Sequence, residues 1–240
     1  MAYANELSEP VPLDRLLRRG VRGRDGLVVL GAHGAVAAVG LDEATVPVVA
    51  AAATEPGIVE FCPNDGTRFA DVPAARRWAA KGRAFVGITV AGDRGARTLL
   101  AYGWSGPEHN DHVPGADVTT AYRVTAAGQA FARRVRAVAH VEFRLGLVLG
   151  ELVVATAVAV GGADPSAVSL ETWASNRAAR RVYADLGFVQ PDGVAEVPAV
   201  RPTLQPVGAA VGGSVVHADP AGGGRRLVDD HRCFYVLRGW

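Results

Sequence analysis

Residues 168–188 read VSLETWASNRAARRVYADLGF, and they give the strongest secondary-structure signal in the sequence. Apolar side chains recur there at the helical spacings i, i+3, i+4 and i+7, which predicts a helix over 177–186 with one buried face. Those apolar positions are Ala179, Val182, Tyr183 and Leu186. Ser175 or Asn176 is placed to cap the start of this helix, and Gly187 is placed to end it. The residues before the cap are rich in strand formers, so the stretch predicts a strand, a polar turn and an amphipathic helix.

The segments LETWASN at 170–176 and LGF at 186–188, with Tyr183 between them, form a recognisable pattern. It resembles the acetyl-CoA site of the GNAT acetyltransferase superfamily, in which a strand ends in a polar segment with Asn and the next helix contains a Tyr and ends in Gly-Phe. The resemblance implies an α/β, GNAT-like acyl-CoA N-acyltransferase fold, with a mixed central sheet flanked by helices. It also implies that Asn176 binds the pantetheine or substrate side of the site and that Tyr183 gives a proton to the departing thiolate.

Each of these residues also has a purely structural interpretation. Asn176 is a good helix N-cap whatever the function, and Tyr183 lies on the apolar face of its helix, as a core tyrosine does. Glu171 fits either a general base or a charged pair on the surface of its strand. The functional interpretation therefore depends on the joint spacing of these residues.

The second GNAT signature is a pyrophosphate loop of the form Gln/Arg-x-x-Gly-x-Gly/Ala, and the sequence contains two partial matches to it. These are FRLGLV at 143–148 and TAAGQA at 125–130. Spacing favours the first match. It opens a predicted helix over 147–160, and that helix leads directly into the predicted strand at 167–173. The resemblance then assigns cofactor binding to Asn176 and to Gly146, Leu147, Val148, Leu149 and Gly150. The glycines fit packing positions in a buried helix equally well, and the second match requires a longer helix or an insertion.

Elsewhere the chain alternates strand and helix signals, which predicts a mixed α/β domain. The predicted elements are a strand over 58–61, a helix over 72–81 capped by Asp71, strands over 84–90, 97–104 and 118–124, and a closing strand over 232–238. The stretch 128–145 fits both a helical and an alternating pattern, and we favour a strand for its second half. Residues 189–224 are rich in Pro and Gly and lack periodicity, which predicts a long loop.

These signals divide the chain at about residue 55. Residues 1–55 contain no chemical signature and are expected to form an N-terminal extension or a small subdomain. Residues 56–240 then form the GNAT-like acetyltransferase domain, with a loop-rich segment at about 189–224.

Composition excludes several classes of partner. The 240 residues are 49% hydrophobic and 20% charged with a net charge of +1, so we expect a folded chain that binds no nucleic acid. The apolar run at 145–162 has Glu151 near its centre, which favours a buried helix and no membrane span. Two distant cysteines and the lack of a secretion signal favour the cytoplasm. His109 and His112 lie in a polar loop, as solvated histidines do, so we expect no metal site.

The function that the resemblance implies is transfer of an acetyl or short acyl group from acetyl-CoA to a primary amine, with Tyr183 as the general acid. The acceptor is a small-molecule or protein amine, and a homodimer remains open. The alternative is a catalytically inactive GNAT-like ligand-binding or regulatory protein, which the imperfect pyrophosphate loop favours.

Overall fold

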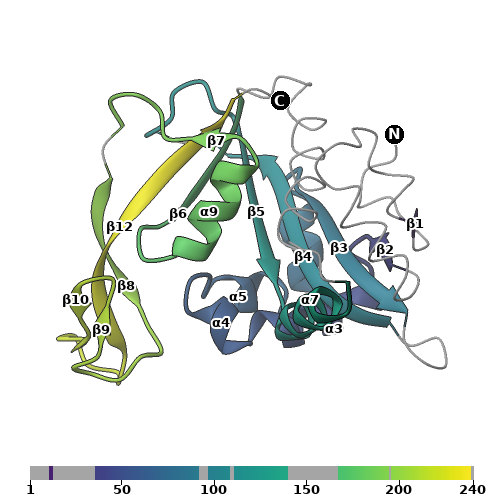
Figure 1. Ribbon diagram of the computed structural model, residues 1–240, viewed down its shortest axis with the longest axis horizontal. Helices are drawn as coiled ribbons and strands as arrows, with labels where there is room; N and C mark the ends of the chain where they lie inside the picture. The colour runs from purple at the N-terminus through teal and green to yellow at the C-terminus, as the bar shows by residue number, and fades with distance from the viewer. Residues whose placement is uncertain are drawn as a thin grey trace.

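One mixed sheet dominates the computed structural model, which describes residues 11–12, 36–91, 97–108, 111–139, 167–194 and 196–238 (Figure 1). Its main path, in spatial order, is β1 (Val11–Pro12), β2 (Val36–Val39), β3 (Ala84–Ala91), β4 (Arg97–Pro107), β5 (Val118–Val124), β6 (Val168–Trp173), β12 (Arg226–Leu237) and β11 (His217–Ala218). Strands β7 (Phe188–Val189) and β8 (Val197–Pro202) also pair with β12, and β9 (Ala210–Val211) pairs with β10 (Ser214–Val215). Among the pairs described, only β5 and β6 run parallel.

Helices cover the sheet and enclose separate apolar cores, which confirms the predicted mixed sheet flanked by helices. The helices are α3 (Thr45–Ala53), α4 (Pro56–Val59), α5 (Asp65–Arg68), α6 (Val72–Ala79), α7 (Ala126–Ala139) and α9 (Arg177–Asp185). The first core packs α3 and α6 on β3 and β4, with Phe69 and Trp78 edge to face at 5.0 Å. Asp71 caps α6 by accepting from the Ala74 amide at 2.7 Å, as predicted.

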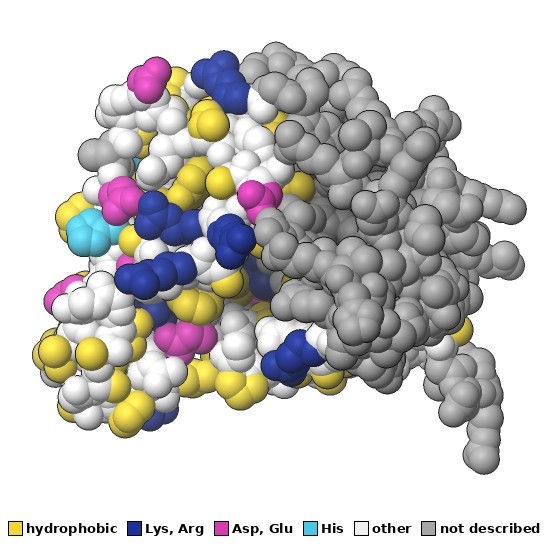
Figure 2. Space-filling view, viewed as in Figure 1, with side chains coloured by type: hydrophobic (Ala, Val, Ile, Leu, Met, Phe, Trp, Pro, Cys, Tyr) yellow, Lys and Arg dark blue, Asp and Glu magenta, His cyan; other side chains and the backbone are white. Residues whose placement is uncertain are grey.

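Helix α9 encloses a second core and has the predicted form. The Asn176 side chain accepts from the Ala179 amide at 3.3 Å, and Gly187 follows the helix with φ of 91°. Tyr183 and Leu186 face β6 and β12 and are buried. The opposite face of α9 is basic, and Lys and Arg side chains gather over it in Figure 2. Because one face of α9 is apolar and the other is basic, the apolar face packs against the sheet.

Two helices replace predicted strands. Residues 56–59 form α4, because Pro56 occupies its first turn and the Ile58 amide bonds back to the Glu55 carbonyl, so the apolar pair belongs to a helical turn. Helix α7 extends to Ala139, so the strand favoured for the second half of 128–145 is wrong as far as the described residues reach. Gly128 lets this helix approach the sheet, since a Cβ there would lie 1.9 Å from the Leu100 carbonyl oxygen.

The predicted loop over 189–224 is wrong in part, because strands lie within it. Strand β8 pairs with β12 over six residue pairs from Val197 to Pro202, and β12 begins at Arg226, ahead of the predicted closing strand. The prolines at 198 and 202 indicated a loop, but proline is tolerated at the edge of a sheet, and β12 is the one strand that pairs with β8 in the described part of the chain. The segment is therefore an extended hairpin that ends in the small β9–β10 sheet.

The division at residue 55 does not separate two cores. Strand β2 pairs with β3, and Val46 and Val49 of α3 pack in the same core as Phe85. Residues 36–55 therefore belong to the same sheet and core as the rest.

Within the described ranges, no helix is long and apolar enough to cross a membrane, and the apolar run at 145–162 lies outside those ranges.

Candidate functional site

The parallel strands β5 and β6 separate after a very short contact. They pair only at Val118 with Val168 and at Thr119 with Ser169. Beyond that point β5 stays on β4 as far as Val124, whereas β6 stays on β12, so the two strands diverge (Figure 1). The facing edges from Thr120 onward therefore have backbone groups that no described strand uses.

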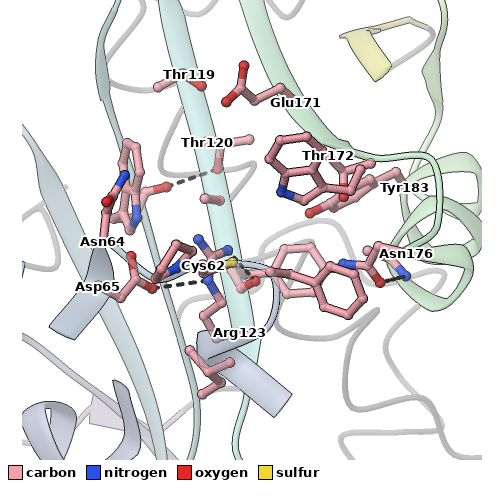
Figure 3. Close-up of a pocket in the computed structure, with 18 of the residues that line it drawn as sticks. Cys62, Asn64, Asp65, Thr119, Thr120, Arg123, Glu171, Thr172, Asn176 and Tyr183 are labelled. Atoms are coloured by element: carbon pink, nitrogen blue, oxygen red, sulfur yellow. Dashed lines mark hydrogen bonds and ion pairs between the residues drawn. The ribbon is translucent and has the colours of Figure 1, made fainter. Parts of the chain in front are cut away.

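A cavity of about 950 Å³ lies at this divergence. We call it the inter-strand cavity; its walls come from the α4–α5 segment, β5, β6 and α9 (Figure 3). Tyr183 and Asn176, the two described residues assigned to the site from sequence, both line it. The proposed loop of Gly146, Leu147, Val148, Leu149 and Gly150 lies outside the described residues.

Tyr183 lies at the boundary between the inter-strand cavity and the apolar core beneath α9. Its side chain is 4% exposed, and its ring meets Tyr122 of β5 edge to face with 5.5 Å between ring centres. Burial raises the pKa of Tyr183 to about 12, although the nearby positive charge of Arg123 opposes this shift. The phenol is therefore protonated at neutral pH and can donate a proton. The hydroxyl of Tyr122 is buried without a hydrogen-bond partner among the described residues, and sequence reasoning missed this second phenol.

Asn176 has the capping role predicted for it, and it lies where the proposed binding role would require. It caps α9 through its side-chain oxygen, and it also lines the inter-strand cavity. Capping fixes where the side chain lies, so its amide group stays at the cavity wall whether or not it binds a ligand.

The cavity wall opposite α9 contains a buried ionic cluster that the sequence did not reveal. Asp65 is fully buried and accepts from the Tyr102 hydroxyl at 3.1 Å, Arg123 Nε at 3.0 Å and Arg68 Nη1 at 3.1 Å. The Arg68 guanidinium also lies over the Trp104 ring, 5.2 Å from its centre. An arginine inside the apolar strand 118–124 was the available signal for this cluster.

Glu171 lies at the opposite end of the cavity from this cluster. It pairs with Arg232 across β6 and β12, and both side chains are substantially exposed. Glu171 also lines the cavity, so it is at once part of a surface pair and a candidate proton acceptor.

His112 also lines the cavity and stacks on Phe234 with 4.3 Å between ring centres, whereas His109 lies outside the described residues. No group of three or more His, Cys, Asp or Glu within the described ranges could hold a metal.

Helix α7 begins directly after the diverging strand β5. Its first turn is the weaker of the two partial loop matches, TAAGQA at 125–130. Thr125 Oγ1 accepts from the Gly128 amide at 3.0 Å, and the Ala126 amide donates to Glu55 Oε2 at 2.6 Å. A side-chain carboxylate therefore occupies the positive end of this helix.

Comparisons with known proteins give structural likeness alone. No protein-family model and no curated protein matches the chain. A GNAT-family acetyltransferase from Streptococcus pneumoniae is similar at 11% identity and a TM-score of 0.47, over 85% of this chain and 99% of that one. AAC(6')-Ib, solved with paromomycin and acetyl-CoA, is similar at 16% identity and a TM-score of 0.45, over 85% and 93%. A chimera of the Vibrio cholerae spermidine N-acetyltransferase SpeG and hSSAT is similar at 12% identity and a TM-score of 0.44, over 84% and 95%.

Proposed function

We propose that this chain is an N-acetyltransferase of the GNAT type, which moves an acetyl or short acyl group from its CoA thioester to a primary amine. The observation that supports this most is the divergence of β5 and β6 over a cavity that reaches Tyr183. Unpaired edges of two strands can bind an extended pantetheine arm as though it were a further strand. The second half of the site, at 170–188, has the spacing that the resemblance requires.

The proposed chemistry uses residues on both sides of the cavity. The amine nitrogen attacks the thioester carbonyl carbon, the C–S bond breaks, and the thiolate leaves with the bonding electrons. Burial raises the pKa of Tyr183 to about 12, so the phenol holds its proton at neutral pH, and it gives that proton to the sulfur as the C–S bond breaks. The proton that the amine loses passes to a carboxylate, directly or through water, and Glu171 is the candidate. That proton then passes through water to the Tyr183 phenolate, which restores both groups.

The phosphates of acetyl-CoA require a separate anion site. The N-terminus of α7 lies at the end of the diverging strand, and a helix N-terminus favours phosphate. We therefore propose residues 125–130 as the pyrophosphate loop, with the Gly146–Gly150 segment as the other candidate. Asn176 is proposed to bind the pantetheine arm.

Acetyl-CoA should raise the melting temperature of the protein in a concentration-dependent manner. A ligand that binds only the folded state adds about 2.7 kcal/mol of stability at a hundred times its Kd. Thermal-shift titration measures this, with acetate and adenosine as controls that lack the thioester arm. Release of free thiol is then followed over a panel of primary amines. A melting temperature that stays constant at millimolar acetyl-CoA would contradict the proposed function.

Replacing Glu55 by Gln should tighten acetyl-CoA binding. The Glu55 carboxylate contacts the Ala126 amide, where it repels an incoming phosphate and competes for the helix N-terminus. Charges at a helix end are worth about 0.3–1 kcal/mol, so the Kd should fall by about two- to fivefold. Glu43→Gln is the matched control, because Glu43 is exposed and pairs with Arg76 instead. Equal Kd values for Glu55→Gln and wild type would remove 125–130 from the phosphate site and leave the Gly146–Gly150 candidate.

The same Glu55 contact favours a second candidate function, a GNAT-shaped protein that binds a ligand without acyl transfer. A carboxylate on the phosphate-binding end of α7 weakens the case for a working pyrophosphate loop. Acetyl-CoA binding without thiol release from any amine in the panel would support this alternative over the enzyme.

A further inference from the structure

The buried ionic cluster opposite α9 has more positive than negative groups. Asp65, Arg68 and Arg123, which we call the basic wall, combine two guanidinium groups with one carboxylate. The carboxylate is fully buried, whereas the side chains of Arg68 and Arg123 are 28% and 14% exposed. All three residues line the inter-strand cavity. The basic wall therefore presents a surplus positive charge to the cavity.

The neighbours of the basic wall do not cancel this charge. Burial raises the pKa of the Cys62 thiol and, with the charge of Asp65, raises the pKa of the Tyr102 phenol well above its ordinary value. Both groups are therefore neutral at physiological pH. Among the described residues, Arg68 uses only Nη1 in a hydrogen bond, so part of its guanidinium fork remains available to a ligand.

The carboxylates that line the cavity lie mainly at its other end. Glu171 lies near Thr119, at the opposite end of β5 from Asp65 and Arg123 (Figure 3). Glu108 and Asp111, which also line the cavity, lie between β4 and β5. The Glu108 backbone amide donates to the Asp117 carbonyl at 3.1 Å, and the Glu108 carboxylate pairs with Arg83 at 3.6 Å. Glu171 and Glu108 are thus each paired with an arginine at the end of the cavity away from the basic wall.

The basic wall also lies beside the candidate reaction centre. Arg123 follows Tyr122 in β5, and the Tyr122 ring contacts Tyr183. The positive charge of Arg123 acts on the Tyr183 phenol, and both side chains line the inter-strand cavity, so an anion bound at Arg123 lies in the same cavity as an amine that reacts beside Tyr183. That arrangement suits a small molecule that carries both an amine and an anionic group.

We propose that the acceptor is a small amine that also carries an anionic group, in the simplest case the carboxylate of an amino acid, which binds to the basic wall. Charge-assisted bonds from a planar guanidinium fork suit a carboxylate. The same wall disfavours polyamines, whose additional charges are positive. This inference rests on the proposed function, and it narrows the acceptor class that the function leaves open.

The test compares amino acids with the amines that lack their carboxylate, for example phenylalanine with phenethylamine, on the full chain. Wild type should acetylate the amino acid of each pair with the higher kcat/KM. Arg68→Gln should lower kcat/KM for the amino acids by about 10- to 100-fold, as loss of a charged hydrogen bond does, and lower it for the amines by much less. Arg68→Lys should restore part of the preference. Arg76→Gln removes the same charge from an exposed helix position and should change neither member of a pair.

Two results of this assay would overturn the proposal, and a third transfers its test from acetylation to binding. Equal or better use of the decarboxylated amines would show that no anion is recognised. A raised KM for acetyl-CoA in Arg68→Gln, with acceptor preference unchanged, would assign the basic wall to a CoA phosphate. If no amine is acetylated, the proposed function fails first, and thermal shifts with each pair then decide the anion site separately. A shift with the amino acids that Arg68→Gln abolishes supports the site, and equal shifts within pairs reject it.

Discussion

Tyr183→Phe should lower kcat by about 10²- to 10⁴-fold, the usual contribution of a general acid, while the Kd for acetyl-CoA changes little. The substitution removes one oxygen from a side chain that is 4% exposed and keeps the ring contacts with Tyr122, Phe188 and Tyr235. Because the ring stays in place, a loss confined to kcat separates proton donation from packing. Rapid-quench and steady-state assays of thiol release, with thermal-shift titration of acetyl-CoA, measure the two quantities.

The pH dependence gives this prediction an independent readout. Burial raises the pKa of Tyr183 to about 12, so the phenol keeps its proton across the range in which the enzyme is assayed. The wild-type rate should therefore show no fall attributable to loss of this proton below about pH 11. A descending limb near pH 9 that disappears in Tyr183→Phe would contradict the assigned pKa.

Tyr122→Phe is the matched comparison for Tyr183→Phe. The two phenols meet edge to face at the divergence of β5 and β6, and the Tyr122 hydroxyl has no partner among the described residues. If Tyr122→Phe loses the rate and Tyr183→Phe retains it, the proton donor is on β5 and the role taken from the resemblance is wrong.

Sequence reasoning succeeded where the signals are local. The Asn176 cap, the apolar stripe and the closing Gly187 lie within one helix, so α9 could be predicted almost to the residue. Strands β3, β4 and β5 were predicted for the same reason, because their apolar runs are bounded by turn formers. The placement of Asn176 and Tyr183 on the cavity wall follows from these local patterns, whereas their roles come from the resemblance and stay predictions.

Sequence reasoning failed where a contact joins distant residues. Asp65 lies in a run of turn formers, and its partner Arg123 is 58 positions away, so no local pattern reveals the basic wall. The prolines of β8 indicated a loop because the pairing with β12 that makes it a strand is a tertiary feature. The predicted strand over 58–61 has four residues, three of them apolar, and so short a run does not distinguish a helical turn from a strand.

Arg201→Met should destabilise the protein by about 3–5 kcal/mol, the cost of removing one partner from a buried ion pair. Arg201 of β8 is 1% exposed and donates to Asp230 Oδ2 at 2.8 Å and to Glu60 Oε1 at 2.7 Å, which lies 141 positions away. Methionine fills much of the volume of the side chain but leaves both carboxylates without the arginine that pairs with them. Urea titration measures the free energy of unfolding, and Arg225→Met at the exposed hairpin tip should change it by less than about 0.5 kcal/mol.

Low pH should remove this difference between Arg201→Met and wild type. Burial alone raises the pKa of Glu60 and of Asp230, but hydrogen bonds, including those from Arg201, outweigh it and hold both below their ordinary values. A carboxyl whose pKa is lowered by folding stabilises the protein above its ordinary pKa and loses that effect as the pH falls through the folded value. The difference in unfolding free energy between wild type and Arg201→Met should therefore have its full size at pH 7 and shrink below about pH 4. A gap that persists at pH 3 would mean that Arg201 acts mainly by packing over Phe61, since its guanidinium lies 4.8 Å from that ring centre.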